Sequence, residues 1–177
     1  MIPTKGRKDE DTHLRVLRDA LVIRTKITEV LRVLSLKTQK RINELSDRGV
    51  YAKDDSEISA VQEEMRKARF DEWLIKGESE NIAKTVYELT GMLRRGNTIF
   101  PSKEHPAFVE EVKERRLYMD RALGACYSLL DELQYIAEEV YTDKNKFTPL
   151  ALEIDTLFKR IKNLRQADNR FIKKQEA

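Results

Sequence analysis

The chain has 177 residues, of which 40% are hydrophobic and 37% are charged, and its formal net charge is +3. Six glycines, four prolines and 7% aromatic residues argue against a turn-rich β sandwich or barrel, so we expect a single all-α domain. The longest apolar stretch, residues 20–23, is far shorter than the roughly 18 residues of a membrane span, and the first residues lack the apolar segment of a signal peptide. The expected location is therefore the cytoplasm.

Clusters of turn-forming residues divide the chain into four predicted helices. They cover residues 12–45, 56–95, 106–140 and 148 to near the C-terminus. Residues 1–12 are predicted to be a flexible charged tail, and residues 13–177 to form one domain.

Apolar residues recur at helical spacing in each predicted segment. The second helix keeps its apolar register past Gly77, which predicts one continuous helix. In the third, the spacing alternates strictly between four and three residues, at Met119, Leu123, Cys126, Leu130, Leu133, Ala137 and Val140. Short connections force neighbouring helices to be antiparallel. The sequence therefore predicts an up-down-up-down antiparallel four-helix bundle with long helices.

Charge is distributed unevenly among the four segments. Residues 1–50 hold 12 basic and 7 acidic residues, and residues 142–177 hold 9 and 5, whereas residues 51–97 hold 8 and 10, and residues 98–141 hold 5 and 9. Because the first and last helices of such a bundle are adjacent, the two basic segments should share one side.

That basic side is the predicted nucleic-acid-binding surface, since like charges on adjacent helices are explained if they contact a polyanion. Its residues are Arg18, Lys26, Arg32, Lys37, Lys159, Lys162, Arg165, Arg170, Lys173 and Lys174. The alternative is that these side chains only make the protein soluble.

Four polar residues interrupt the apolar stripes: Arg24, Ser79, Arg116 and Asp168. A buried charge is tolerated only when it is paired, so we predict a structural polar layer of Arg24, Ser79, Arg121 and Asp168, in which Asp168 pairs with Arg24 or Arg121. The alternative is that these positions lie near open, hydrated ends of the bundle.

Catalytic and metal-binding patterns are nearly absent from the sequence. Glu10 and His13 form one isolated Glu-x-x-His, although a di-metal site in a bundle requires two such pairs and two further glutamates. Cys126 lies in an apolar seam and is predicted to be a small core residue. We find no phosphate-binding loop, nucleophile elbow or zinc-ligand spacing. The sequence therefore predicts no catalytic residue, metal or cofactor, and a protein that is not an enzyme.

The second half of the chain resembles a known family. The residues that carry the likeness are Glu114-Arg115-Arg116-Leu117-Tyr118, Ala122, Cys126, Ser128-Leu129-Leu130, Glu132-Leu133-Gln134-Tyr135, Asp143-Lys144-Asn145-Lys146-Phe147, Ile154-Asp155 and Leu164-Arg165-Gln166-Ala167-Asp168-Asn169-Arg170. They look like the accessory variability determinant proteins of diversity-generating retroelements, which are related to the four-helix bundle proteins encoded in ribosomal RNA intervening sequences. The resemblance covers roughly residues 86–170, and the long first helix and its partner have no counterpart in it.

This resemblance implies a basic, ring-like homo-oligomer, such as a pentamer, that binds a reverse transcriptase and its template RNA and supports cDNA synthesis. The leading hypothesis is therefore a noncatalytic accessory protein that binds RNA and a reverse transcriptase. The alternative is a helical scaffold or adaptor that recognises another protein through Trp73, Phe70 and Tyr118, without nucleic acid.

Overall fold

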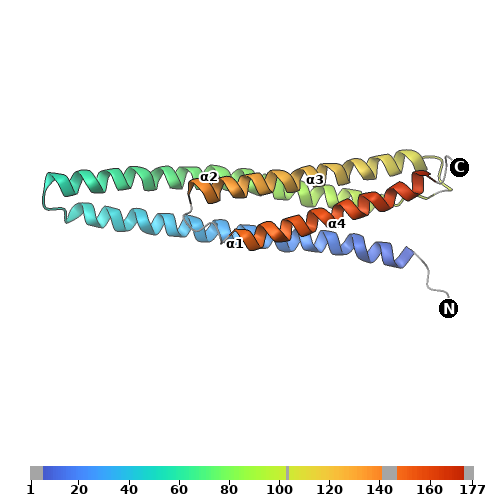
Figure 1. The fold of residues 1–177 in the computed structure, drawn as a ribbon, viewed down its shortest axis with the longest axis horizontal. Helices are drawn as coiled ribbons and strands as arrows, with labels where there is room; N and C mark the ends of the chain where they lie inside the picture. Colours follow the sequence, from blue (N-terminus) through green and yellow to red (C-terminus); the bar gives the residue numbers. More distant parts are fainter. Residues whose placement is uncertain (1–5, 103, 141–146, 174–177) are drawn as a thin grey trace.

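The computed structural model describes residues 6–102, 104–140 and 147–173, and it describes side chains for residues 14–169 within these ranges. This part of the chain forms four helices and no strand: α1 (Gly6–Val50), α2 (Asp55–Thr98), α3 (Phe108–Glu139) and α4 (Thr148–Lys173) (Figure 1). The predicted all-α class is confirmed.

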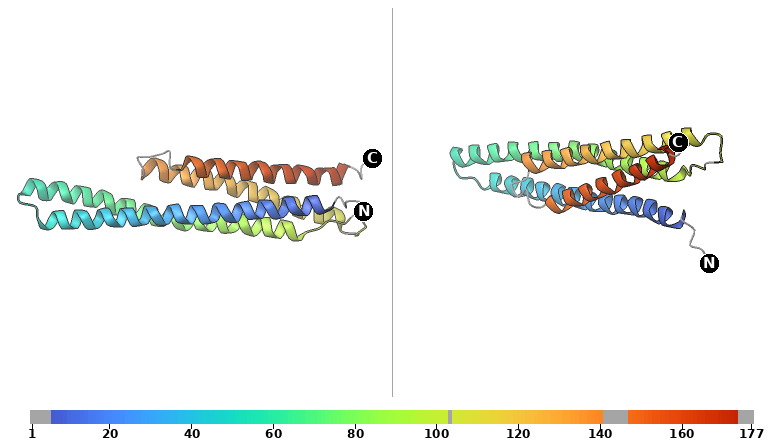
Figure 2. Two further views of the ribbon diagram at one scale, coloured as in Figure 1. Left: turned by 90° about the horizontal axis from the view of Figure 1, so that it is seen from below. Right: turned by 45° about the vertical axis from the view of Figure 1, so that its right-hand side comes forward.

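The four helices pack in a ring. Helix α1 contacts α2, α2 contacts α3, α3 contacts α4, and α4 returns to contact α1. Successive helices run in opposite directions, as the views in Figures 1 and 2 show. The up-down-up-down antiparallel bundle is therefore confirmed, and so is the expectation that the first and last helices are neighbours.

All four helices contribute to one aliphatic core. Its fully buried side chains include Ile27 of α1, Ile82 of α2, Leu129 of α3 and Ile154 of α4. Buried apolar surface of this kind is the main favourable contribution to folding, at about 25 cal/mol per Å².

The continuous core does not extend along the whole of α1 and α2. Leu34 is the last α1 residue in it, and Ile75 is the first α2 residue in it. Beyond these positions, residues 35–74 form a two-helix extension that we call the hairpin arm, and Figure 2 shows it projecting past the end of α3 and the start of α4. Its α1 part, residues 35–50, projects roughly 24 Å at 1.5 Å per residue.

The hairpin arm has its own small interface. Leu45 of α1 and Val61 and Ala68 of α2 are buried in it. Ion pairs flank this contact: Arg41 Nη1 lies 3.7 Å from Asp71 Oδ2, and Arg48 Nη1 lies 3.2 Å from Glu64 Oε2. The arm is thus a paired extension of the bundle, and all four helices pack together along only part of α1 and α2.

Several helix boundaries differ from the sequence prediction. Helix α1 begins at Gly6, within the segment predicted to be a tail, and continues through Gly49 to Val50. Helix α2 is continuous past Gly77, as predicted, and also includes Gly96. Helix α3 begins at Phe108, so Pro106 lies in the preceding turn instead of at the first helical position. An isolated glycine weakens a helix by only about 1 kcal/mol, and the cooperative helix formation of the neighbouring residues offsets that cost.

The turn between α1 and α2 is short and is fixed by a cap. The Asp54 carboxylate accepts a hydrogen bond from the Glu57 backbone N–H at 2.8 Å, and the Glu57 side chain accepts one from the Lys53 N–H at 2.9 Å. These contacts satisfy N–H groups at the start of α2, where the helix itself offers no acceptors.

The buried face of α3 is wider than the predicted seam. Met119, Cys126, Leu133 and Ala137 are buried as expected. Leu123, Leu130 and Val140 are only partly buried and pack at the margin of the core. Four seam neighbours that the prediction omitted are buried: Ala122, Ala125, Leu129 and Ile136. Because α3 contacts both α2 and α4, it needs a broader apolar face than a single seam provides.

Gly77 provides a test of the continuous α2 helix. A Cβ at this position would meet no atom within 4 Å, whereas a Cβ at Gly96 would lie 2.6 Å from Met119 Cε in the filled core. We expect Gly77→Ala to raise the free energy of unfolding by about 0.5–1 kcal/mol, because alanine loses less backbone entropy in a helix. Gly96→Ala should show no such gain. Chemical denaturation of both variants measures the difference, and a loss of stability in Gly77→Ala would contradict an unstrained helix there.

Candidate nucleic-acid interface

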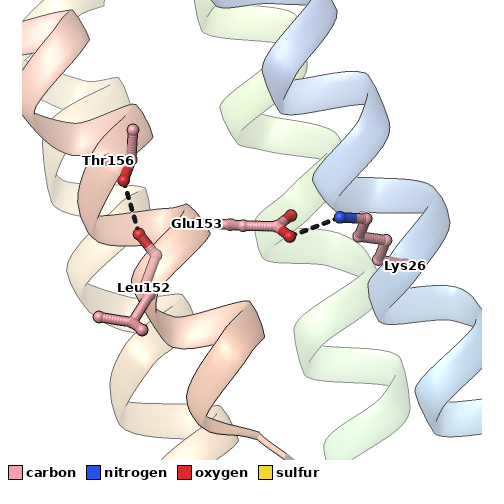
Figure 3. A network of polar contacts seen from close by, with 4 residues as sticks. All are labelled: Lys26, Leu152, Glu153 and Thr156. Atoms are coloured by element: carbon pink, nitrogen blue, oxygen red, sulfur yellow. Dashed lines mark hydrogen bonds and ion pairs between the residues drawn. The ribbon is translucent and has the colours of Figure 1, made fainter.

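The contact between α1 and α4 is lined by interhelical ion pairs. Lys26 Nζ of α1 lies 2.5 Å from Glu153 Oε1 of α4, and Figure 3 shows the two side chains meeting between the helices. One turn further along α4, Thr156 donates from its hydroxyl to the Leu152 carbonyl at 2.8 Å and stays within its own helix (Figure 3). Arg160 of α4 pairs with Asp19 of α1. These contacts fix the register of the two basic helices.

Most of the predicted nucleic-acid-binding side chains that the structure describes are exposed on α1 and α4. Arg18, Lys26, Arg32, Lys37, Lys159 and Lys162 are exposed, and Arg165 is half-buried. Arg170 and Lys173 belong to α4, but the structure does not describe their side chains. Lys174 lies outside the described residues. The structure thus places the described members on α1 and α4, but Lys37 lies on the hairpin arm, outside the part of α1 that belongs to the four-helix core.

Several of these cations have carboxylate partners. Besides Lys26, Arg32 pairs with Glu29 at 2.7 Å, and Lys159 pairs with Asp155 at 2.6 Å. Arg165 pairs with Asp120 of α3, with Nη2 to Oδ2 at 3.2 Å. None of these pairs was predicted. The three-residue spacing of Glu29 and Arg32 and the four-residue spacing of Asp155 and Lys159 within one helix are the sequence signals for two of them.

Arg18 and Lys162 belong to the predicted set and have no carboxylate within ion-pair distance among the described residues. Arg15 and Arg24 of α1 are also exposed and unpaired by the same measure, although the prediction did not include them. Ion pairs made within these two segments leave their positive surplus unchanged, because their acidic residues are already counted in it, whereas Arg165 pairs with Asp120 outside them.

Asp168 is buried, as predicted, but its partner differs from both predicted ones. Asp168 is 3% exposed, and its Oδ2 lies 3.2 Å from Nε of Arg115, which is 6% exposed. Arg115 also donates from Nη1 to the Ile99 carbonyl at 3.0 Å. This single arginine connects α3 to α4 and to the end of α2.

The predicted polar layer of Arg24, Ser79, Arg121 and Asp168 is therefore wrong. Arg24 and Arg121 are exposed, and the half-buried Ser79 hydroxyl donates to the Ile75 carbonyl of its own helix at 2.5 Å. Arg116 is half-buried, and its neighbour Arg115 is the buried residue. One residue changes the direction of a helical side chain by about 100°, so an error of one residue in the stripe of α3 is enough to select Arg116 in place of Arg115.

Between α2 and α3 lies a partly buried carboxylate. Glu132 Oε1 accepts a hydrogen bond from the Thr85 hydroxyl at 3.0 Å, whereas Oε2 is buried with no hydrogen-bond partner among the described residues. Burial raises the pKa of Glu132, the Thr85 hydrogen bond opposes that effect, and the nearby Glu78 and Asp131 add to it. Ionised Glu132 is therefore less favourable in the folded protein than in the unfolded chain.

Replacing Glu132 should make stability less dependent on pH. Because the pKa of Glu132 is raised in the folded protein, its ionisation lowers the free energy of unfolding at pH values above that pKa. This loss disappears as the pH falls below the pKa of Glu132 in the unfolded chain. We expect Glu132→Gln to melt at a higher temperature than the wild type at pH 7, and the difference to shrink at acidic pH. Melting curves measured from pH 7 to pH 3.5 give the comparison. A difference that stays constant with pH would contradict the raised pKa.

Cys126 is fully buried, and burial raises the pKa of its thiol to about 12. The thiol therefore stays protonated at neutral pH, which suppresses nucleophilic and metal-binding chemistry. The prediction that Cys126 is a small core residue is confirmed.

The described residues contain no group of three or more His, Cys, Asp or Glu side chains that could hold a metal ion. His105 Nδ1 lies 3.2 Å from Glu111 Oε1, near the start of α3. Among the described helices, none is both long enough and apolar enough for a membrane crossing.

The exposed aromatic residues lie mainly as predicted. Phe70 and Trp73 are 56% and 68% exposed on the hairpin arm. Tyr118 is half-buried, and its hydroxyl donates to Glu114 at 3.4 Å, so it is a smaller part of the surface than the alternative hypothesis assumed.

No protein-family model, curated protein or solved structure matches the chain. The resemblance to accessory variability determinant proteins therefore stays a prediction.

Proposed function

We propose that this protein is a noncatalytic RNA-binding protein that contacts RNA through the surface formed by α1 and α4. The observation that supports the proposal is the packing of α1 against α4, because these helices belong to the two segments with a surplus of basic residues. Exposed cations on these two neighbouring helices would release counterions from a phosphate backbone that lies along the contact.

The proposed protein partner is a reverse transcriptase, which the bundle would assist in cDNA synthesis as part of a homo-oligomer. This part of the proposal rests on the resemblance of residues 86–170. Sedimentation of the purified protein measures the homo-oligomer, and affinity capture with a candidate reverse transcriptase measures the partnership, with RNase treatment separating a direct contact from one bridged by RNA.

The RNA contact is tested by fluorescence anisotropy of a labelled single-stranded RNA. We expect the affinity to fall at least tenfold between 50 and about 200 mM salt, as counterion release requires. Arg18→Glu and Lys162→Glu should each weaken binding and reduce the salt dependence. Lys113→Glu on α3 is the matched control, since Lys113 is also exposed and unpaired among the described residues but lies outside the proposed surface.

An RNA affinity that does not change with salt would contradict the proposal. An equal loss of affinity in Lys113→Glu and in the α1 and α4 variants would contradict it as well. Recovery of the protein from its native cell with a protein partner and without RNA would instead support the helical scaffold or adaptor.

A further inference from the structure

Two exposed aromatic rings lie together near the base of the hairpin arm. Phe70 and Trp73 are three residues apart on α2, and their ring centroids are 5.7 Å apart with an interplanar angle of 35°. Both side chains are more than half exposed. Large aromatic surfaces in contact with water are costly, so an exposed pair is informative about binding.

Basic residues surround this pair at helical spacing. Arg69 precedes Trp73 by four residues and Lys76 follows it by three, so both lie on the same face of α2 as the indole ring. Neither has a carboxylate within ion-pair distance among the residues that the structure describes. Arg66 precedes Phe70 by four residues and shares Glu63 with Lys67, at 2.9 Å and 3.6 Å respectively.

A surface hollow of about 350 Å³ adjoins Phe70 and is lined also by Arg66, Lys67 and Asp71. The carboxylate of Asp71 faces Arg41 of α1 at 3.7 Å, so a cation already lies beside its charge. The hollow therefore offers a ligand an aromatic wall beside Arg66 and Lys67, which share the Glu63 carboxylate.

We propose that Phe70 and Trp73 form a base-stacking site for single-stranded RNA, with Arg66, Arg69 and Lys76 contacting the adjacent phosphates. Nucleobases stack on exposed aromatic rings while nearby arginine and lysine side chains bind the backbone, so both features of the patch fit one ligand. This inference rests on the proposed RNA-binding function and adds a second contact, on the hairpin arm.

The protein contains one tryptophan, so its intrinsic tryptophan fluorescence reports on Trp73 alone. The experiment titrates the full chain with a single-stranded RNA of 15 nucleotides, and follows tryptophan fluorescence and the anisotropy of a label on the RNA in parallel. We expect saturable quenching with the same midpoint as the anisotropy change. A duplex RNA of the same length should produce little quenching, because its bases are already stacked.

Variants separate stacking from other contacts. Trp73→Ala should weaken single-strand binding about tenfold, and Trp73→Phe, which keeps an aromatic ring, should restore most of the affinity. Tyr87→Ala is the matched control, because Tyr87 is an equally exposed aromatic residue of α2 that lies outside the arm. Circular dichroism confirms that each variant keeps its helical content.

Single-strand binding without quenching and without loss in Trp73→Ala would overturn the stacking site and leave the proposed function intact. Equal quenching by duplex RNA would also overturn it. No anisotropy change with wild-type protein would overturn both proposals, whereas quenching of Trp73 by an acidic protein in the absence of any RNA binding would assign the patch to a protein partner.

Discussion

Asp168→Ala is expected to lower the free energy of unfolding by about 3–5 kcal/mol, because it leaves the Arg115 guanidinium buried without its carboxylate. Both side chains of the pair are almost fully buried. Arg115 also bonds the Ile99 carbonyl, so its displacement would disturb the end of α2 as well. For a chain of this size, the melting temperature should fall on the order of 10 °C.

The matched control is Asp155→Ala, since Asp155 is another α4 aspartate, paired with Lys159 on the surface. Exposed pairs contribute little, and this variant should change stability by about 0.5 kcal/mol or less. Replacing both buried partners together, Arg115→Met with Asp168→Leu, should recover most of the loss, because no unpaired charge remains. A double variant as unstable as Asp168→Ala would contradict the explanation by an orphaned charge.

Leu129→Ala is expected to destabilise the protein by about 2–5 kcal/mol, because it leaves a cavity in the shared core. Leu129 is 0% exposed on α3, in the core to which all four helices contribute. The control is Leu117→Ala on the same helix, where the leucine is 47% exposed, and we expect a change of about 0.5 kcal/mol or less.

Urea denaturation of both leucine variants and the wild type gives the two differences in unfolding free energy. Equal losses for Leu129→Ala and Leu117→Ala would be incompatible with the orientation of α3 in the bundle. A large loss for Leu129→Ala alone would support it.

The sequence predicted which segments are helical more reliably than it predicted where they end. The apolar stripe of α2 passes Gly77 without interruption, and the helix is continuous there. The first two predicted helices ended at residues 45 and 95, yet Gly49 and Gly96 beyond these ends are helical. A glycine costs only about 1 kcal/mol in a helix, and packing against a neighbouring helix is enough to offset that.

The candidate surface was predictable in outline but not in detail. Adjacency of α1 and α4 follows from four helices joined by short loops, and the exposure of Arg18 and Lys162 follows from their places off the apolar stripe. The pairing of Arg165 with Asp120 depends on how far α3 and α4 are displaced along each other. The residue types within either helix do not encode that displacement directly.

Four amphipathic helices, their antiparallel order and the unequal charge of the segments follow from the residue pattern, because periodicity and connection length are local properties of the chain. The packing of the helices is what takes residues 35–74 out of the core as a hairpin arm and brings Arg115 to Asp168. An apolar stripe has the same pattern whether one neighbouring helix or two cover it, so the pattern does not show where the four-helix core ends. A shift of one residue rotates a helical side chain by about 100°, so the pattern does not show which arginine meets Asp168.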